Sequence, residues 1–183
     1  MRPGLKNIFR KFWTVKGWMI RGNFAFVGDI NIGVRKTKKG HKQVLVFMNT
    51  RKELLNKIKC SGFPAKEVVL TLDEFFVGNR DMGSIGVNLY PIQPPPQTFY
   101  KTFKQLLQDG KIEYAFVRIA DIEEVEWFFT DAIFVIGNIS FEELQQEVAN
   151  IEPSEISPGW MYGLPANLPN DFTGKQVYSL WWD

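Results

Sequence analysis

Three acidic side chains stand close together in the middle of the chain. Asp73, Glu74 and Asp81 lie within nine residues, beside a glycine-containing turn. Paired carboxylates of this kind bind Mg²⁺ or serve as the general acid and base of a hydrolase. The same residue types also have structural uses, because Glu74 follows Thr71 at capping-box spacing and Asp81 is a common turn residue. We therefore expect a structural role for this cluster and keep a carboxylate- or metal-dependent hydrolase as the last alternative.

The sequence lacks the residues that other common catalytic sites require. His41 is the single histidine and Cys60 the single cysteine, so a serine–histidine or cysteine–histidine site would depend on one imidazole in a cationic loop. A structural zinc site is mostly built from Cys and His and is excluded by the same count. The run from Gly78 to Ser84 has the glycine spacing of a phosphate loop but lacks its lysine. We assign no catalytic residue, no metal and no cofactor, and we favour a protein that is not an enzyme.

An acidic and aromatic region favours a protein partner. Carboxylates surround Trp127, in the expected connection between the strands at 112–119 and 132–136. The C-terminal part of the chain adds further aromatic residues. Aromatic side chains anchor protein interfaces, and the carboxylates suit a basic partner. A solvated hairpin with inward-pointing aromatic residues has the same pattern. The candidate partner-binding residues are Glu123, Glu124, Glu126, Trp127, Trp160 and Tyr162.

The net charge of +2 hides a strong asymmetry along the chain. Residues 1–60 contain 15 Lys and Arg against two acids, whereas residues 61–183 contain seven against 18. A basic end beside aromatic residues is typical of proteins that bind nucleic acid or another anionic surface, although two mutually facing or merely solvated halves would look the same. The loop at residues 35–42 contains five cations, and because like charges repel we expect this loop to be exposed. The candidate anion-binding residues are Arg35, Lys36, Lys38, Lys39 and Lys42.

Hydrophobic periodicity and turn signals predict the elements that position these groups. Residues 5–17 show helical spacing, and two apolar runs at 24–34 and 44–48 predict a β-hairpin. Thr50, Thr71 and Ser140 each precede a glutamate at capping-box spacing and predict three helix starts. The start at Thr71 follows an expected strand at 67–70, and we expect only a short helical turn there. A further helix is expected from Thr98 to Gly110. Further strands are expected at 85–90, 112–119, 132–136 and 176–181.

The order of these elements predicts an α+β fold. From residue 85 onwards they run strand, helix, strand, strand, helix, strand, which is the ferredoxin-like βαββαβ order. We expect an antiparallel or mixed sheet with helices on one face, formed by an acidic domain at 61–183. A basic region at 1–60, with its N-terminal helix, hairpin and second helix, would pack on it. Residues 150–174 are expected to form an unusually long loop, which is a mild indication of function.

Three segments carry a resemblance to known proteins. The runs at 72–86, 127–135 and 177–183 resemble a group of uncharacterised bacterial proteins, over about residues 65–183. The resemblance supplies no catalytic residue. It implies a bacterial cytoplasmic protein of unknown role, by analogy an immunity-type or accessory binding protein.

The sequence as a whole favours a non-enzymatic protein-interaction module. With 45% hydrophobic and 23% charged residues the composition is globular, and one cysteine is compatible with a reducing, cytoplasmic setting. The apolar runs are far shorter than the roughly 20 residues of a transmembrane helix. Nucleic-acid or anionic-surface binding through the first 42 residues is the alternative. The sequence leaves homo-oligomerisation open.

Overall fold

The computed structural model describes residues 51–89, 91–122 and 127–183 in full, and the backbone of five strands within the first 50 residues. It divides the chain into two compact units, residues 1–54 and 55–183. Among the described residues, no helix is both long enough and apolar enough to cross a membrane.

The N-terminal unit contains two small antiparallel sheets. Strand β1 covers residues that we expected in a helix, so that prediction is wrong over Trp13–Val15, and residues 5–12 lie outside the described part. Aromatic and β-branched residues favour a strand there, and Gly17 lies between β1 and β2. The chain also reverses between Val27 and Ile30, which pair with each other, so the expected run at 24–34 is two strands. The strands are β1 (Trp13–Val15), β2 (Trp18–Ile20), β3 (Phe24–Val27), β4 (Ile30–Lys36) and β5 (Lys42–Phe47).

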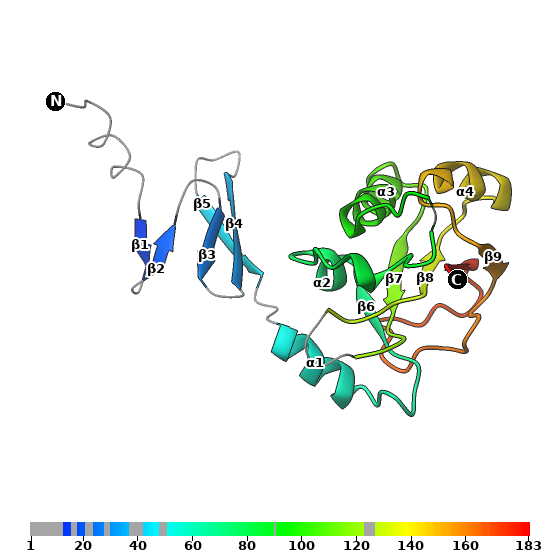
Figure 1. The fold of residues 1–183 in the computed structure, drawn as a ribbon, viewed down its shortest axis with the longest axis horizontal. Coiled ribbons are helices and arrows are strands. Elements are labelled where there is room, and N and C mark those ends of the chain that lie inside the picture. The colour runs from blue at the N-terminus through cyan, green and yellow to red at the C-terminus, as the bar shows by residue number, and fades with distance from the viewer. Residues whose placement is uncertain are drawn as a thin grey trace. The chain divides into compact units, whose positions relative to one another are not determined.

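A five-stranded sheet forms the centre of the C-terminal unit (Figure 1). Every neighbouring pair is antiparallel, in the order β6-β7-β8-β10-β9. The α+β class is thus confirmed, with the strands at 67–70, 112–119, 132–136 and 176–181 present within a few residues of their expected bounds. The strands are β6 (Val69–Thr71), β7 (Tyr114–Arg118), β8 (Ala132–Ile136), β9 (Glu155–Pro158) and β10 (Val177–Trp181).

The ferredoxin-like detail is not confirmed. No strand forms over the described residues 85–89 of the expected strand 85–90. Instead Gly86 adopts a φ of +64°, and its carbonyl accepts the N–H of Leu89 in a turn. β6 and β7, which the helices connect, are direct antiparallel neighbours. In a split βαβ unit the two helix-linked strands would be parallel, with another strand between them.

The helices begin close to the expected capping residues. Helix α2 has a complete capping box between Thr71 and Glu74, and Ser140 accepts the Glu143 N–H at the start of α4. Helix α3 begins at Pro96, two residues before the expected Thr98, because proline suits the first helical position. Phe141, the first residue of α4, is 38% exposed. The helices are α1 (Arg51–Cys60), α2 (Leu72–Phe76), α3 (Pro96–Gln108) and α4 (Phe141–Glu147), with short 3-10 turns at Met82–Ser84 and Ala149–Ile151.

The two faces of the sheet have different covers. On one face, α2 and α3 pack against β7, and α3 buries Phe99 and Phe103. On the other face, the long segment before β10 supplies the cover. Its residues Trp160, Tyr162 and Leu168 pack on a core cluster of Val69, Phe116, Phe134, Ile136, Phe172 and Val177. The expected long loop is therefore a layer of the fold, and it includes strand β9, which we did not predict.

Candidate functional site

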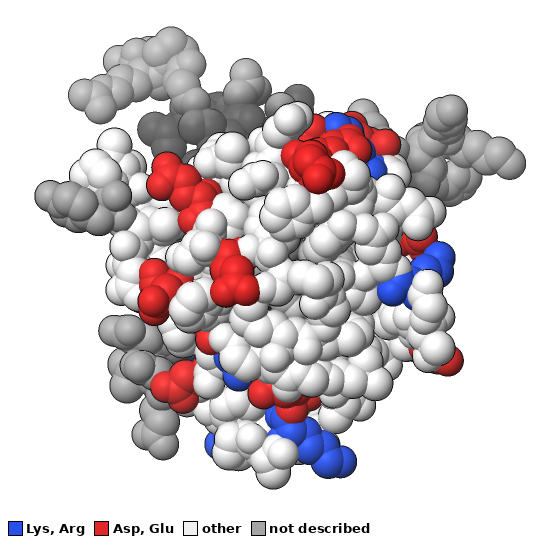
Figure 2. Space-filling model, turned by 90° about the vertical axis from the view of Figure 1, so that its right-hand side faces the viewer, with Lys and Arg blue, Asp and Glu red and all other residues white. Residues whose placement is uncertain are grey.

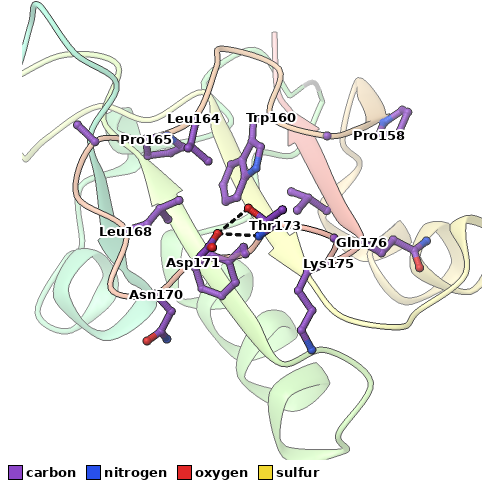
Figure 3. Close-up of a pocket in the computed structure, with 15 residues that line it drawn as sticks. Pro158, Trp160, Leu164, Pro165, Leu168, Asn170, Asp171, Thr173, Lys175 and Gln176 are labelled. Atoms are coloured by element: carbon purple, nitrogen blue, oxygen red, sulfur yellow. Dashed lines mark hydrogen bonds between the residues drawn. The ribbon is translucent and has the colours of Figure 1, made fainter.

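A hollow lies in the long segment between β9 and β10. It has a volume of about 570 Å³. Figure 3 shows the segment passing across the sheet, with Trp160 pointing between its two arms. We call this hollow the loop groove. Its lining residues include Pro158, Trp160, Leu164, Pro165, Leu168, Asn170, Asp171, Phe172, Thr173, Lys175 and Gln176.

Aromatic packing supports the floor of the loop groove. Trp160 meets Phe134 of β8 edge-on, with ring centroids 4.9 Å apart. Phe172 makes similar contacts with Tyr114 at 5.1 Å and Phe116 at 5.8 Å. These contacts bury one side of each ring and leave Trp160 half-buried at the groove. The floor is therefore apolar and built from packed aromatic rings, as ligand-binding hollows usually are.

The rim of the loop groove combines an apolar side chain with polar groups. Leu164 is 68% exposed. The Asp171 carboxylate accepts hydrogen bonds from the Thr173 hydroxyl (2.7 Å) and N–H (2.9 Å), which lower the pKa of Asp171. Lys175 forms an ion pair with Glu113 at 2.9 Å. The rim offers hydrogen bonds and one apolar contact, and no acid–base pair converges on it.

A charged cluster holds the loop segment on the sheet. Arg118 of β7 forms ion pairs with Glu67 (2.9 Å) and Asp131 (2.8 Å), and its side chain is 14% exposed. The Tyr162 ring stacks 3.7 Å from the Arg118 guanidinium carbon, and its hydroxyl donates to Asp131 at 3.2 Å. We call these four residues the arginine clamp. Burial would lower the pKa of Arg118, but hydrogen bonds to Glu67 and Asp131 outweigh it and raise that pKa overall.

Two further contacts fasten the same segment. The Asn167 side chain accepts the Val69 N–H at 2.9 Å and donates to the Val69 carbonyl at 2.7 Å, as a neighbouring strand would. It therefore covers the free edge of β6, which would otherwise expose unpaired backbone groups. At the other end, the buried Ser179 hydroxyl donates to Gly159 and accepts the Met161 N–H. The loop groove is thus preformed.

The predicted acidic cluster does not converge. Asp73 accepts hydrogen bonds from the Tyr100 hydroxyl at 2.7 Å and from Lys104 at 3.0 Å. Burial and the nearby Asp73 raise the pKa of Tyr100. Glu74 caps α2 and pairs with Lys57 at 2.6 Å. Burial would raise the pKa of Glu74, but these hydrogen bonds outweigh it and lower that pKa overall.

Asp81 belongs to a separate structural network. Its carboxylate accepts the N–H groups of Gly83 at 2.8 Å and of Trp127 at 3.1 Å. Beneath it, the buried Asn79 donates to the buried Ser84 at 2.9 Å. Within the described part of the chain, no three metal-ligating side chains gather. The three carboxylates act in capping, ion pairing and turn formation.

The candidate partner-binding residues fall into different places. Trp160 lines the loop groove, and Tyr162 lies in the arginine clamp. Trp127 is half-buried, tilts against Phe128 at 5.7 Å and is held through its backbone by Asp81. Glu123, Glu124 and Glu126 lie outside the described residues.

Backbone register brings part of the predicted basic cluster together. Lys36 of β4 lies directly opposite Lys42 of β5, and Arg35 lies opposite Gln43. Lys38 and Lys39, in the connection between these strands, lie outside the described residues.

Sequence reasoning missed Leu164, Leu168, Asn167 and Arg118. A signal existed for Leu164 and Leu168, because apolar residues recur within a Pro- and Asn-rich segment, which is unusual for a purely solvated loop. Arg118 gave no local signal, because its partners lie 51 and 13 residues away in the chain.

Comparison with known proteins covers mainly the C-terminal unit. Residues 49–180 match the model of a family described as the Uncharacterized protein YfbO family. Over 116 residues the chain is 31% identical to the Uncharacterized protein YfbO of Escherichia coli strain K12, which covers 63% of this chain and 82% of that protein. No solved structure matches the chain. The resemblance to uncharacterised bacterial proteins is thereby confirmed, and the chain belongs to the YfbO family.

Proposed function

We propose that the chain is a non-enzymatic binding module that holds a short segment of another protein in the loop groove. The observation that carries this proposal is the preformed hollow of about 570 Å³ with an exposed Leu164 at its rim. An apolar side chain of the partner would lie against Trp160 and Leu164. Asn170 and Gln176 at the rim would meet the partner's backbone, since such polar groups fix the orientation of a ligand.

Charge supports a basic partner. Residues 61–183 carry 18 acids against seven Lys and Arg. Figure 2 shows a largely uncharged face on which carboxylates outnumber cations. Complementary charge accelerates encounter and disfavours acidic competitors. The favoured occupant is therefore an extended segment with one large apolar side chain flanked by Lys or Arg.

The test uses the full chain and a phage-displayed library of random short peptides. We expect selected peptides to combine an apolar residue with Lys or Arg. Leu164→Asp should weaken their binding at least about tenfold, because it places a carboxylate against the apolar side chain. The matched control is Ile92→Asp, which alters a similarly exposed apolar residue outside the groove. Failure to select any peptide, or equal binding by the Leu164→Asp variant, would contradict the proposal.

The basic hairpin favours a second function, binding to nucleic acid. Lys36 and Lys42 are paired in the register of β4 and β5, and like charges at directly paired positions are destabilising. A phosphate backbone would neutralise them. We expect the full chain to bind single-stranded DNA with an affinity that falls steeply with salt.

Replacing Lys36, Lys38, Lys39 and Lys42 by Gln should remove most of this binding and flatten its salt dependence. The matched control replaces Lys66 and Lys101, two exposed lysines of the C-terminal unit. Binding that ignores salt, or that survives the hairpin replacements, would reject this second function.

A further inference from the structure

A short proline-rich segment stands in front of α3. Residues 91–96 read Pro-Ile-Gln-Pro-Pro-Pro, and residues 91–95 lie outside any helix or strand. Gln93, Pro94 and Pro95 each precede a proline, which restricts them to extended conformations. Pro95 has φ −63° and ψ 152°, the values of a polyproline II helix. We call residues 91–95 the proline ridge.

Two pairs of positions three residues apart have a similar degree of burial, as in a polyproline II helix, whereas Pro91 is exposed and Pro94 half-buried. Gln93 is half-buried, and Pro96, three positions later, is buried. Ile92 and Pro95, also three positions apart, are both exposed. One edge of the ridge therefore faces the protein and another faces solvent.

Hydrogen bonds hold the ridge in place. The Gln93 side-chain amide donates to the carbonyls of Met82 and of Ile85, the latter at 3.0 Å. Just behind the ridge, Gln97 donates to the carbonyls of Phe76 at 2.7 Å and Asn79 at 3.0 Å. A partner would bind the ridge without first ordering it, which lowers the entropic cost of association.

A simple linker does not account for the exposed edge. Pro96 alone supplies the favoured first residue of α3. Yet Ile92 is 82% exposed, more than any other large apolar side chain that the structure describes. Met82 and Val87, at 40% and 44%, are exposed in the same stretch of chain. Apolar exposure concentrated on one segment is typical of a contact surface.

We propose that the proline ridge is a ligand for a partner protein with an aromatic-lined groove that recognises polyproline II segments. The solvent side presents Pro91, Ile92 and Pro95, with Pro94 half-buried, while the Gln93 side chain turns inward to the carbonyls of Met82 and Ile85. Pro91 and Pro94 have the Pro-x-x-Pro spacing that such grooves bind. The surface is distinct from the loop groove, since the groove lining and the ridge share no residue.

The test titrates the unlabelled full chain into a purified WW domain and a purified SH3 domain, each labelled with ¹⁵N. We expect chemical-shift changes in the aromatic groove of at least one domain. Ile92→Asp and Pro95→Ala should each weaken this binding by about tenfold or more. Replacing the groove tryptophan of the responding domain by alanine should abolish it.

Two variants of the chain serve as controls. Phe141→Asp changes an exposed apolar residue of α4, outside this stretch of chain, and Leu164→Asp changes the loop groove. Both should bind as the unaltered chain does, and thermal melting verifies that every variant is folded. Absence of shifts in both domains, or equal binding by the folded Ile92→Asp and Pro95→Ala variants, would overturn the proposal. Neither result would bear on peptide binding in the loop groove.

Discussion

Two proline-containing segments of the C-terminal unit differ in what they do with their apolar residues. The proline ridge turns Ile92 outward, whereas the segment between β9 and β10 turns Trp160, Leu168 and Phe172 onto the sheet. The ridge has consecutive prolines and therefore one stiff conformation. In the longer segment, glycines such as Gly163, with φ +89°, separate the prolines and allow the chain to fold back. Proline content alone therefore does not distinguish a projecting ligand from an enclosing layer.

The arginine clamp should be the strongest support of the enclosing segment. Arg118→Ala would leave the carboxylates of Glu67 and Asp131 half-buried without their counter-charge and remove the stacking surface of Tyr162. We expect a loss of about 3 kcal/mol in the free energy of unfolding. Urea denaturation measures this loss, and hydrogen exchange in the variant should show faster opening of 159–174 than of helix α3, which follows the ridge. Equal opening of 159–174 and α3 would contradict the role of the clamp in holding the enclosing segment.

The edge contact of Asn167 should have the next largest effect. Asn167→Ala removes two hydrogen bonds and leaves the Val69 N–H and carbonyl without them at the edge of β6. We expect a loss of about 2 kcal/mol in urea denaturation. Asn170→Ala, an exposed asparagine of the same segment, is the control and should change stability little. A loss for Asn167→Ala no greater than for this control would show that the edge contact contributes nothing.

The ridge should depend mainly on one side chain beneath it. Gln93→Ala removes the amide that donates to Met82 and Ile85. We expect a loss of about 1 kcal/mol in the free energy of unfolding and weaker binding to the WW or SH3 domain, because the ridge is no longer held. Gln108→Ala, at the end of α3, is the control. Unchanged domain binding would mean that the prolines alone keep the ridge rigid.

Much of the local structure could be predicted from sequence. The strand at 132–136 and the capping of α2 and α4 follow from apolar runs and from Thr71 and Ser140, which act within a few residues. The loop groove could not be predicted, because it depends on distant partners. Asn167 and Val69 are 98 residues apart in the chain. The acidic residues show the converse, since Asp73 and Asp81 are close in sequence but take part in different hydrogen-bond networks.

Lowering the pH should have the smallest effect on the free energy of unfolding. It acts on helix α2, which supports the residue just behind the proline ridge. The Phe76 carbonyl that receives Gln97 belongs to α2, whose first turn Glu74 caps. Because the pKa of Glu74 is lower in the folded chain than its ordinary value of 4.5, its contribution is full above about pH 4.5 and is lost as pH falls through the folded value.

Glu74→Gln should therefore reduce stability by about 0.5 kcal/mol at neutral pH, and the difference should vanish in acid. Urea denaturation at several pH values measures it. Glu142→Gln, on the exposed side of α4, is the control and should show no such pH dependence. A constant difference between the Glu74→Gln variant and the unaltered chain at every pH would contradict the assigned role.

The indole N–H signal of Trp160 tests the central proposal most directly. In the ¹⁵N-labelled full chain, a library-selected peptide should shift this signal and the backbone signals of Leu164 and Leu168. The backbone signals of Ile92 and Gln93, the ridge residues that have an N–H, should stay in place. A peptide that binds the chain while the Trp160 indole signal does not move would contradict binding in the loop groove.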